Sequence, residues 1–391
     1  MQMQAETVIG EVTQRPIVRS ASLRADHPDA GAQLARILRT DDLDTVILFA
    51  SPRANIPALV ADAQRSMGRA RVVGCTTAGE INAHGYTEGE IVAIGLPRAQ
   101  FRSRAVLLEN LGDGPNADLV PRLLAARNEL ISEAPGWDHE FAFLMVDGMS
   151  LREDVLVTQV ATALGPIPLF GGSAGDMNRF SRTQVFAAGR ALQKAAVLLL
   201  VRTRCPIRVF RTDHFAPLDR RMVVTRADPE ARIVSEINGA PAGPEYARIL
   251  GKDPAQLDTF TFASHPVVVK VGGQHHVRAI QRVAPSGDLH FFSAIGEGLV
   301  LTLAGSEDMP THLERELSAL ASDITPDIIL GCDCILRRLE AEQKQVTGAL
   351  SAILSHHRVR GFSTYGEQHG AMHVNQTLTG VAIYPPPEGT A

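Results

Sequence analysis

Three short glycine turns carry the residue types that most readily contact a small ligand. They are residues 77–80 within "VVGCTTAGEI", residues 173–176 within "FGGSAGDM" and residues 364–367 within "RGFSTYGEQ", and each has a hydroxyl residue, a glycine and then an acid. Glycine permits positive φ and has no Cβ, so such a turn can bring backbone N–H groups close to an anion. The hydroxyl groups can donate hydrogen bonds to a ligand, and the carboxylates can accept them. We therefore expect a ligand pocket formed by Thr77, Gly79, Glu80, Gly172, Ser173, Gly175, Asp176, Thr364, Tyr365, Gly366 and Glu367.

The same pattern also suits a plain tight turn that closes two strands. A fourth match at residues 87–90 lacks an apolar stretch before it, which shows how readily the pattern arises by chance. The pattern alone therefore favours a structural turn over a ligand site. The second gap between the three copies is nearly twice the first, and this spacing indicates duplicated units.

The elements that must position these turns alternate between short apolar runs and segments of helical periodicity. Strand candidates are residues 45–50, 71–74, 90–96 and 141–146. Two helices are predicted: one after Asn55, with Ile56, Leu59, Val60, Ala63 and Met67 on one face, and one after Ser150, a candidate N-cap, with Leu156, Val160, Ala163 and Leu164 at helical spacing. This alternation predicts an α/β layer.

The pattern changes to closely spaced strands from Val209 onward, which indicates a more antiparallel second half. A strand leads into one long amphipathic helix over residues 335–357, and two further strands follow. The Gly- and Pro-rich stretch "INGAPAGPEY" places a domain boundary around residues 225–245. Residues 385–391 form a tail.

The length, composition and net charge of the chain argue against several classes of protein. A chain of 391 residues with 45% hydrophobic and 21% charged residues is typical of a soluble globular protein of two or more domains. A net charge of -5 and the lack of a basic stripe argue against nucleic-acid binding. The strongest apolar run, residues 195–201, is shorter than the ~20 residues of a membrane span and predicts a buried strand. We see no signal peptide and expect a cytoplasmic protein without membrane insertion.

The four cysteines are too few to crosslink a chain of this size, and we expect reduced thiols. Cys332 and Cys334 form a C-x-C pair that offers two of the four ligands of a tetrahedral zinc site. Further ligands would have to come from Cys75, His356 or His357. A redox-sensitive thiol at a helix start is the alternative.

Several separate blocks, in order, resemble the FIST family of bacterial sensory domains. "VVGCTTAGEI" and "FGGSAGD" resemble signatures of its N-domain, and "VSEINGAPAGPEYARILG", "GCDCILRRLE" and "GFSTYGEQHGAMHVNQT" resemble blocks of its C-domain. The resemblance implies an α/β (α+β) fold with mixed β-sheets flanked by helices. It divides the chain into a FIST N-type domain at residues 30–235 and a FIST C-type domain at residues 236–380.

The resemblance extends to a subset of the family whose members contain haem and sense nitric oxide. It implies a noncovalent haem b, because the chain has no C-x-x-C-H motif, and a separate signalling partner, either a histidine kinase or a cyclic-di-GMP enzyme. Two-component signalling and biofilm regulation follow from the same subset. A homo-oligomer is compatible with the family. The alternative is a FIST sensor without haem that binds an amino acid or another small ligand.

Four residues are candidates for the haem site. His214 follows a strand and precedes Phe215, which would supply apolar surface to a porphyrin; His214 would ligate the iron. His265 lies at a strand entrance, and Cys205 precedes a proline, as thiolate haem ligands often do. His369 and His373 follow the third glycine turn and could instead line a pocket with Tyr365.

Enzyme activity is the third and least favoured hypothesis. Residues 171–175 satisfy G-x-S-x-G, the pattern that exposes a nucleophilic serine between a strand and a helix. The segment after Ser173, "DMNRFSRTQVF", is a poor helix, so a hydrolase is not expected and we predict no catalytic residues.

Overall fold

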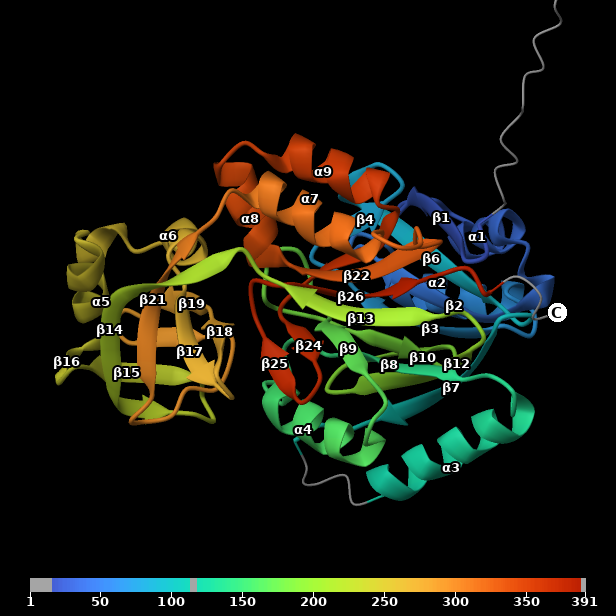
Figure 1. Ribbon diagram of the computed structural model, residues 1–391, viewed down its shortest axis with the longest axis horizontal. Helices are drawn as coiled ribbons and strands as arrows, with labels where there is room; N and C mark the ends of the chain where they lie inside the picture. The colour runs from blue at the N-terminus through green and yellow to red at the C-terminus, as the bar shows by residue number, and fades with distance from the viewer. Residues whose placement is uncertain (1–15, 113–117, 388–391) are drawn as a thin grey trace, which may run out of the picture.

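The computed structural model describes residues 16–112 and 118–387. The start of the chain, where we expect no signal peptide, and the last four residues of the expected tail lie outside the described residues. The chain forms a mixed α/β body with a smaller lobe beside it (Figure 1). This confirms the predicted fold class. No described helix has the length and apolar character needed to cross a membrane.

The body consists of three units with the same order of strands. In each unit the first strand lies at the edge and pairs with the last strand, the last pairs with the second, and the second pairs in parallel with the third. The units are therefore repeats, as the spacing of the glycine turns indicates. The first unit contains β1 (Arg19–Arg24), β2 (Leu43–Ala50), β3 (Arg71–Thr76) and β6 (Glu90–Pro97). The second contains β7 (Phe101–Leu108), β8 (His139–Val146), β9 (Leu169–Ser173) and β12 (Ala196–Thr203). The third contains β13 (Ile207–Thr212), β22 (Ile328–Cys334), β23 (Val359–Thr364) and β26 (Leu378–Ile383).

Each unit sends a short hairpin to a sheet of another unit. The three hairpins are β4 (Glu80–Asn82) with β5 (Gly85–Thr87), β10 (Val185–Ala187) with β11 (Arg190–Leu192), and β24 (Glu367–His369) with β25 (Met372–Val374). Strand β4 of the first unit pairs with β23, β24 of the third pairs with β9, and β10 of the second pairs with β3. The exchange closes a ring of three units, and each glycine turn precedes the hairpin that leaves its unit.

The strands bury one face against the centre of the ring and the other against helices. The central core is apolar and aromatic, with Phe49 stacked on Phe362 at 4.5 Å between ring centroids and Phe143 stacked on Phe170 at 4.7 Å. A separate apolar cluster lies under the helices of each unit. These helices are α1 (Ala30–Leu38) and α2 (Ile56–Ser66), α3 (Leu119–Glu133) and α4 (Glu153–Leu164), and α7 (Met309–Leu320), α8 (Ile335–Gln343) and α9 (Thr347–His356).

The lobe at the left of Figure 1 is an insertion into the third unit, between β13 and α7. It explains the unequal spacing of the glycine turns, because the third repeat contains an extra lobe ahead of its turn. The lobe has an eight-stranded sheet with a core of its own. Its elements are β14 (Phe215–Asp228), β15 (Ile233–Ile237), β16 (Ala240–Pro241), α5 (Ala242–Leu250), α6 (Thr259–Ser264), β17 (Val267–Val271), β18 (Gln274–Arg278), β19 (Ile280–Val283), β20 (Leu289–Phe291) and β21 (Val300–Ser306).

Most predicted elements are confirmed, and two details are wrong. Helix α2 has Asn55 as its N-cap, which accepts from the Ala58 N–H, and the run at residues 195–201 lies in the buried strand β12. Helix α4 starts later than predicted, so the Ser150 hydroxyl oxygen accepts from the Arg152 N–H and does not cap the helix. The predicted long helix breaks into α8 and α9, because Gln345 between them has a φ of 57°.

Candidate functional site

The three glycine turns meet one another inside the body. The Ala78 N–H donates to Ser363 O at 2.8 Å, the Gly175 N–H donates to Thr76 O at 3.0 Å, and the Ser173 N–H donates to Gly366 O at 2.8 Å. All the turn residues with side-chain polar groups are buried. Several of the backbone donors that we expect to face a ligand therefore bind a neighbouring turn and hold the three units together.

The first and third turns each contain the same internal hydrogen bond, from the hydroxyl residue to the acid three residues later. The Thr77 hydroxyl donates to the Glu80 carboxyl group, and the Thr364 hydroxyl donates to the Glu367 carboxyl group. Burial raises the pKa of Glu80 to about 7 and that of Glu367 to about 8. Each pair closes its turn from within. The second carboxyl oxygen accepts from outside the turn, from the Glu90 N–H at 3.1 Å for Glu80 and from the Thr377 N–H and hydroxyl at 3.2 and 2.8 Å for Glu367.

The second turn differs because its acid accepts a hydrogen bond from a side chain of the third turn. Burial alone would raise the pKa of Asp176, but hydrogen bonds from Tyr365, Arg182 and Ser181 outweigh it and lower the pKa. The Tyr365 hydroxyl donates to Asp176 and accepts from the backbone N–H groups of Asp176 and Phe180 at 3.1 and 3.2 Å. Tyr365 and Asp176 therefore join the second and third turns.

A group of buried polar atoms without partners surrounds the third turn. Among the described residues, seven buried side-chain nitrogen or oxygen atoms have no hydrogen-bond partner. Five of the seven lie in a stretch of fourteen residues that contains the third turn and its hairpin. Because buried polar groups are almost always paired, these atoms are candidates for contact with ordered water or with a bound polar molecule. The atoms are Ser363 Oγ, Gln368 Oε1, His373 Nε2, Asn375 Nδ2 and Gln376 Oε1.

Two of these atoms converge beside Gly366. A Cβ atom placed on Gly366 would lie 2.9 Å from His373 Nε2 and 2.9 Å from Asn375 Nδ2. A side chain on residue 366 would fill the space that the two nitrogens share. Gly366 has a φ of 156°, a conformation that other residues rarely adopt. The nearest atom to that Cβ would be His373 Cε1 at 2.4 Å, so glycine lets the His373 ring and the Asn375 amide pack directly against the backbone of residue 366.

The hydrogen bonds of His373 set the chemistry of its free nitrogen. Its Nδ1 lies 3.1 Å from Glu367 O and 3.3 Å from the Gln368 amide nitrogen. Because the carbonyl oxygen can only accept, we assign the hydrogen to Nδ1, which leaves a lone pair on Nε2. Burial lowers the pKa of His373, which keeps the ring neutral. The site thus presents an amide donor at Asn375 together with acceptors at His373 and Gln376, and it suits a molecule that carries both donors and acceptors.

The inserted lobe closes this site from outside the body. The Gln376 amide donates to Ala263 O in α6 at 2.7 Å, the Ser293 hydroxyl donates to Asn375 Oδ1 at 2.5 Å, and the Arg278 guanidinium donates to His373 O at 3.2 Å. The polar cluster therefore lies at the junction of lobe and body. A molecule bound here would contact both parts.

A buried ion pair fixes the lobe beside this junction. Arg232 of the lobe bonds Glu153 in α4 at 2.5 Å and Asp154 at 3.2 Å, and its side chain is only 5% exposed. On the apolar side, Phe180 of the second unit packs on Phe292 of the lobe, with ring centroids 5.8 Å apart. The lobe thus contacts the second unit through ion pairs and an aromatic pair, and the third unit through the hydrogen bonds of the polar cluster.

His214 is placed where an iron ligand is not expected. The Arg337 guanidinium donates to its Nδ1 at 2.9 Å, and Nε2 donates to Glu340 at 3.0 Å. Both ring nitrogens are engaged, so neither offers a lone pair to a metal, and the ring is completely buried among charged groups. The neighbouring Phe215 packs on the imidazole, with centroids 4.1 Å apart. His214 does not fit the role of an axial haem ligand in this structure.

The other haem candidates are separate from His214. Cys205 lies before β13 and His214 after it, and burial raises the pKa of the Cys205 thiol to about 11, which disfavours a thiolate ligand. His265 follows α6 in the lobe and is half-buried. Its Nδ1 lies 3.2 Å from Thr261 O, so the ring is oriented by the backbone with Nε2 free. Of the four residues, His265 alone has the bonding pattern of a metal-binding histidine.

The C-x-C pair and Ser173 are all buried. Cys332 and Cys334 are buried free thiols whose pKa values burial raises well above the ordinary value, which disfavours a reactive thiolate. No group of three or more metal-ligating side chains occurs within the described ranges. Ser173 ends β9 and is followed by a loop and β10, and its hydroxyl accepts from Gln368 at 3.0 Å. It lacks the helix that a nucleophile elbow requires.

Sequence reasoning missed most of the polar cluster. It named His373 as a residue that could line a pocket with Tyr365, but it did not single out Gln368, Asn375 or Gln376. A usable signal was present, because "HVNQT" is a polar run between two strands, where exposed turns usually have glycine or proline. Burial of such a run is the unusual feature, and only the structure reveals it.

The fold and the cluster define a class of protein: a mixed α/β body with a buried polar site at its junction with a second lobe. The family model of the FIST N domain matches residues 44–240, and that of the FIST C domain matches residues 242–369. The chain belongs to the FIST family, whose domains are sensory domains of signalling proteins. A search of the curated proteins finds no match.

Proposed function

We propose that this FIST protein senses a small polar molecule, such as an amino acid, at the junction of the third glycine turn and the inserted lobe. The observation that carries the proposal is the convergence of His373 Nε2 and Asn375 Nδ2, both buried and without partners, against the backbone of Gly366. Asn375 would donate to a carboxylate or carbonyl oxygen of the ligand. His373 and Gln376 would accept from its amino or hydroxyl group.

The signal would arise from the position of the lobe. Gln376, Asn375 and His373 belong to the body, whereas their partners Ala263, Ser293 and Arg278 belong to the lobe. A ligand that binds the closed arrangement more tightly than an open one shifts the population toward closure. A separate partner, a histidine kinase or a cyclic-di-GMP enzyme, would then bind one arrangement in preference to the other.

Removing the polar atoms is expected to abolish ligand binding. The purified protein is screened against the common amino acids by thermal shift, and hits are measured by calorimetry. We expect Asn375→Leu and Gly366→Ala to weaken binding at least about tenfold, because loss of a buried hydrogen bond to a charged group costs ~1.5–3 kcal/mol and an alanine Cβ would occupy the point between the two nitrogens.

A matched control separates binding from stability. His312 is also buried with one unpartnered ring nitrogen, but it lies in α7 outside the cluster. His312→Leu should retain ligand affinity, while His373→Leu should lose it. Equal affinities in these two variants, or the absence of any amino-acid hit together with an unshifted melting temperature, would contradict the proposal.

Haem binding with nitric oxide sensing is the second function we propose to test, and the free Nε2 of His265 favours it. His265 would hold the iron, and the haem would supply a gas-binding metal centre. After haem addition, visible spectra are recorded for the wild type, His265→Ala and His214→Ala, oxidised, reduced and with nitric oxide. We expect any stoichiometric Soret band to be altered in His265→Ala and retained in His214→Ala. A band lost only in His214→Ala would overturn this assignment, and no band in the wild type would exclude haem.

A further inference from the structure

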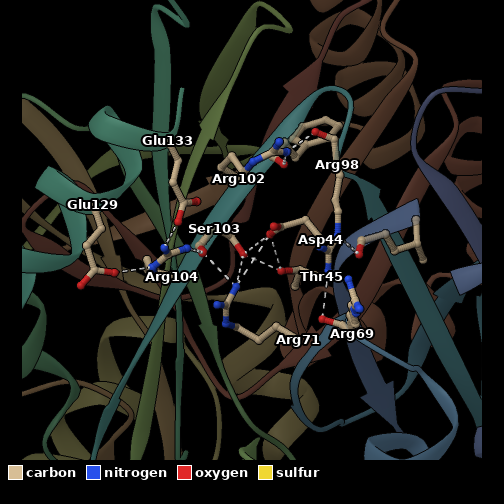
Figure 2. A network of polar contacts seen from close by, with 12 residues as sticks. Asp44, Thr45, Arg69, Arg71, Arg98, Arg102, Ser103, Arg104, Glu129 and Glu133 are labelled. Atoms are coloured by element: carbon tan, nitrogen blue, oxygen red, sulfur yellow. Dashed lines mark hydrogen bonds and ion pairs between the residues drawn. The ribbon is translucent and has the colours of Figure 1, made fainter. Parts of the chain in front are cut away.

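A cavity of about 580 Å³ lies between the first and second units, away from the polar cluster, and arginines dominate its wall. Arg69 precedes β3 and Arg71 begins it, Arg98 follows β6, and Arg102 and Arg104 lie in β7. The carboxylates in the wall are Asp44 and Glu133. Figure 2 shows the five arginines gathered around this space from both units.

Arg104 and Arg71 are the two arginines with carboxylate partners. Arg104 bonds Glu129 at 2.6 Å and also Glu133. The Arg71 guanidinium lies 3.7 Å from Asp44 and donates to the backbone and side-chain oxygens of Ser103, each at 2.8 Å (Figure 2). The Ser103 hydroxyl in turn donates to Asp44 at 2.6 Å. Arg71 is therefore held in a fixed position at the base of the cavity.

The other three arginines have no carboxylate partner among the described residues. Arg98 donates to the carbonyl oxygens of Leu43 and Arg69 at 2.9 and 3.1 Å. Arg102 donates to the carbonyl oxygens of residues 98 and 101, and it lies 5.3 Å from the centroid of the Trp137 ring. The exposed Arg69 side chain makes no polar contact of its own in the described part of the chain.

The cavity therefore carries an uncompensated positive charge. Carbonyl oxygens and the indole ring orient Arg98 and Arg102 without neutralising them. Burial lowers the pKa of Arg71. The carboxylates of Asp44 and Glu133 oppose this shift, and the like charges of Arg104 and Arg98 add to it. Arginine forks are suited to bind phosphate oxygens in pairs.

The volume of the cavity and the apolar residues in its wall indicate which class of ligand it can bind. The volume is within the ~300–1,000 Å³ typical of small-molecule sites. Apolar residues line part of the wall, which favours a ligand with an organic portion over a bare inorganic anion. We propose that this cavity binds a small organic phosphate that carries two or more negative charges, with Arg69, Arg98 and Arg102 as its phosphate ligands. The apolar residues include Ala70, Val72, Val73, Ala105, Leu107 and Ala187.

The chain contains a built-in reporter for this site. Trp137 is the single tryptophan of the sequence, and Arg102 covers its ring. A phosphate that draws Arg102 away from the indole would change the tryptophan fluorescence. The full chain is titrated with pyrophosphate and with ADP at constant ionic strength, and calorimetry provides a second measurement that does not depend on Trp137. We expect a saturable change with ADP, and tighter binding of ADP than of pyrophosphate.

The variants test the assignment of residues. Arg69→Gln and Arg98→Gln are each expected to weaken ADP binding roughly tenfold or more, since hydrogen bonds to charged groups are among the strongest in proteins. Arg69 makes no polar side-chain contact within the described ranges, so its variant is expected to fold normally. Arg221→Gln, which changes an exposed arginine of the lobe, is the matched control and should bind as the wild type does.

Three outcomes would overturn the proposal. The first is the absence of both heat and fluorescence change with either probe at millimolar concentration. The second is equal weakening in Arg221→Gln, and the third is an equal response to sodium chloride, which would indicate screening alone. None of these measurements involves the polar cluster at His373, so the amino-acid proposal and this one fail independently.

Discussion

Compared with the double variant Glu80→Gln with Glu367→Gln, the wild type is expected to lose free energy of unfolding as the pH rises from about 5 to about 8. Burial raises the pKa of Glu80 to about 7 and that of Glu367 to about 8 in the folded protein. In the unfolded chain both carboxyl groups titrate near the ordinary value of ~4.3. Between these values the folded protein holds protons that the unfolded chain has released.

The direction of the effect follows from proton binding. Below pH ~4 both carboxyl groups are protonated in both states, and their contribution is fully present. It is lost as the pH rises through the folded pKa values, because the native state must first retain protons that the unfolded chain releases and must then bury carboxylates. One pKa unit corresponds to about 1.4 kcal/mol, so the two groups together account for several kcal/mol.

Glutamine reproduces the protonated form of each acid. At residue 80 its amide nitrogen can donate to the Thr77 hydroxyl and its oxygen can accept from the Glu90 N–H, and at residue 367 the partners are Thr364 and Thr377. Urea unfolding at pH 5, 6.5 and 8 measures the slope of the free energy of unfolding against pH. The exposed Glu230→Gln is the control and should keep the wild-type slope. A double variant as pH-dependent as the wild type would contradict the assignment.

Arg337→Leu is expected to lower the free energy of unfolding by roughly 3–5 kcal/mol, because it leaves buried partners without a counter-charge. Arg337 is 1% exposed and bonds Asp333 at 2.7 Å, and it also donates to His214. The Tyr86 hydroxyl donates to the same Asp333. This network joins the hairpin of the first unit, the helix α8 and the point where the chain enters the lobe.

Urea unfolding near neutral pH tests this expectation. Arg315→Leu removes an exposed arginine that bonds Glu307 and Glu316, and it should leave the unfolding midpoint nearly unchanged. The double variant Arg337→Leu with Asp333→Leu should recover part of the loss, since both buried charges are then absent. Equal destabilisation by Arg315→Leu and Arg337→Leu, or no recovery in the double variant, would show that the buried charges are not the cause.

The sequence predicts the local elements well because they depend on local periodicity. Strand β12 and helix α2 follow directly from apolar spacing and from the Asn55 cap. The ring of three units does not follow in this way, since β4 pairs with β23 and β24 pairs with β9 across more than half of the chain. The inserted lobe further hides the third repeat by separating β13 from α7.

Sites are harder to predict than elements, because partner and burial decide the role of each side chain. His214 next to Phe215 has the sequence of a haem ligand, yet Arg337 and Glu340 occupy its nitrogens from residues far along the chain. The basic cavity, in contrast, is a site that the sequence does not suggest. Its arginines are scattered over two short segments of an acidic chain, and only the pairing of the first two units brings them together without enough carboxylates to neutralise them.

The exchanged hairpins also determine when the chain can complete its sheets during synthesis. Strand β9 ends at Ser173, but its outer partner β24 begins at Glu367, so the sheet of the second unit keeps an open edge until most of the protein has left the ribosome. Such an edge can pair with another chain in the meantime. With so many contacts between distant segments, we expect slow refolding in vitro and a need for chaperones to shield β9 until the last hairpin arrives.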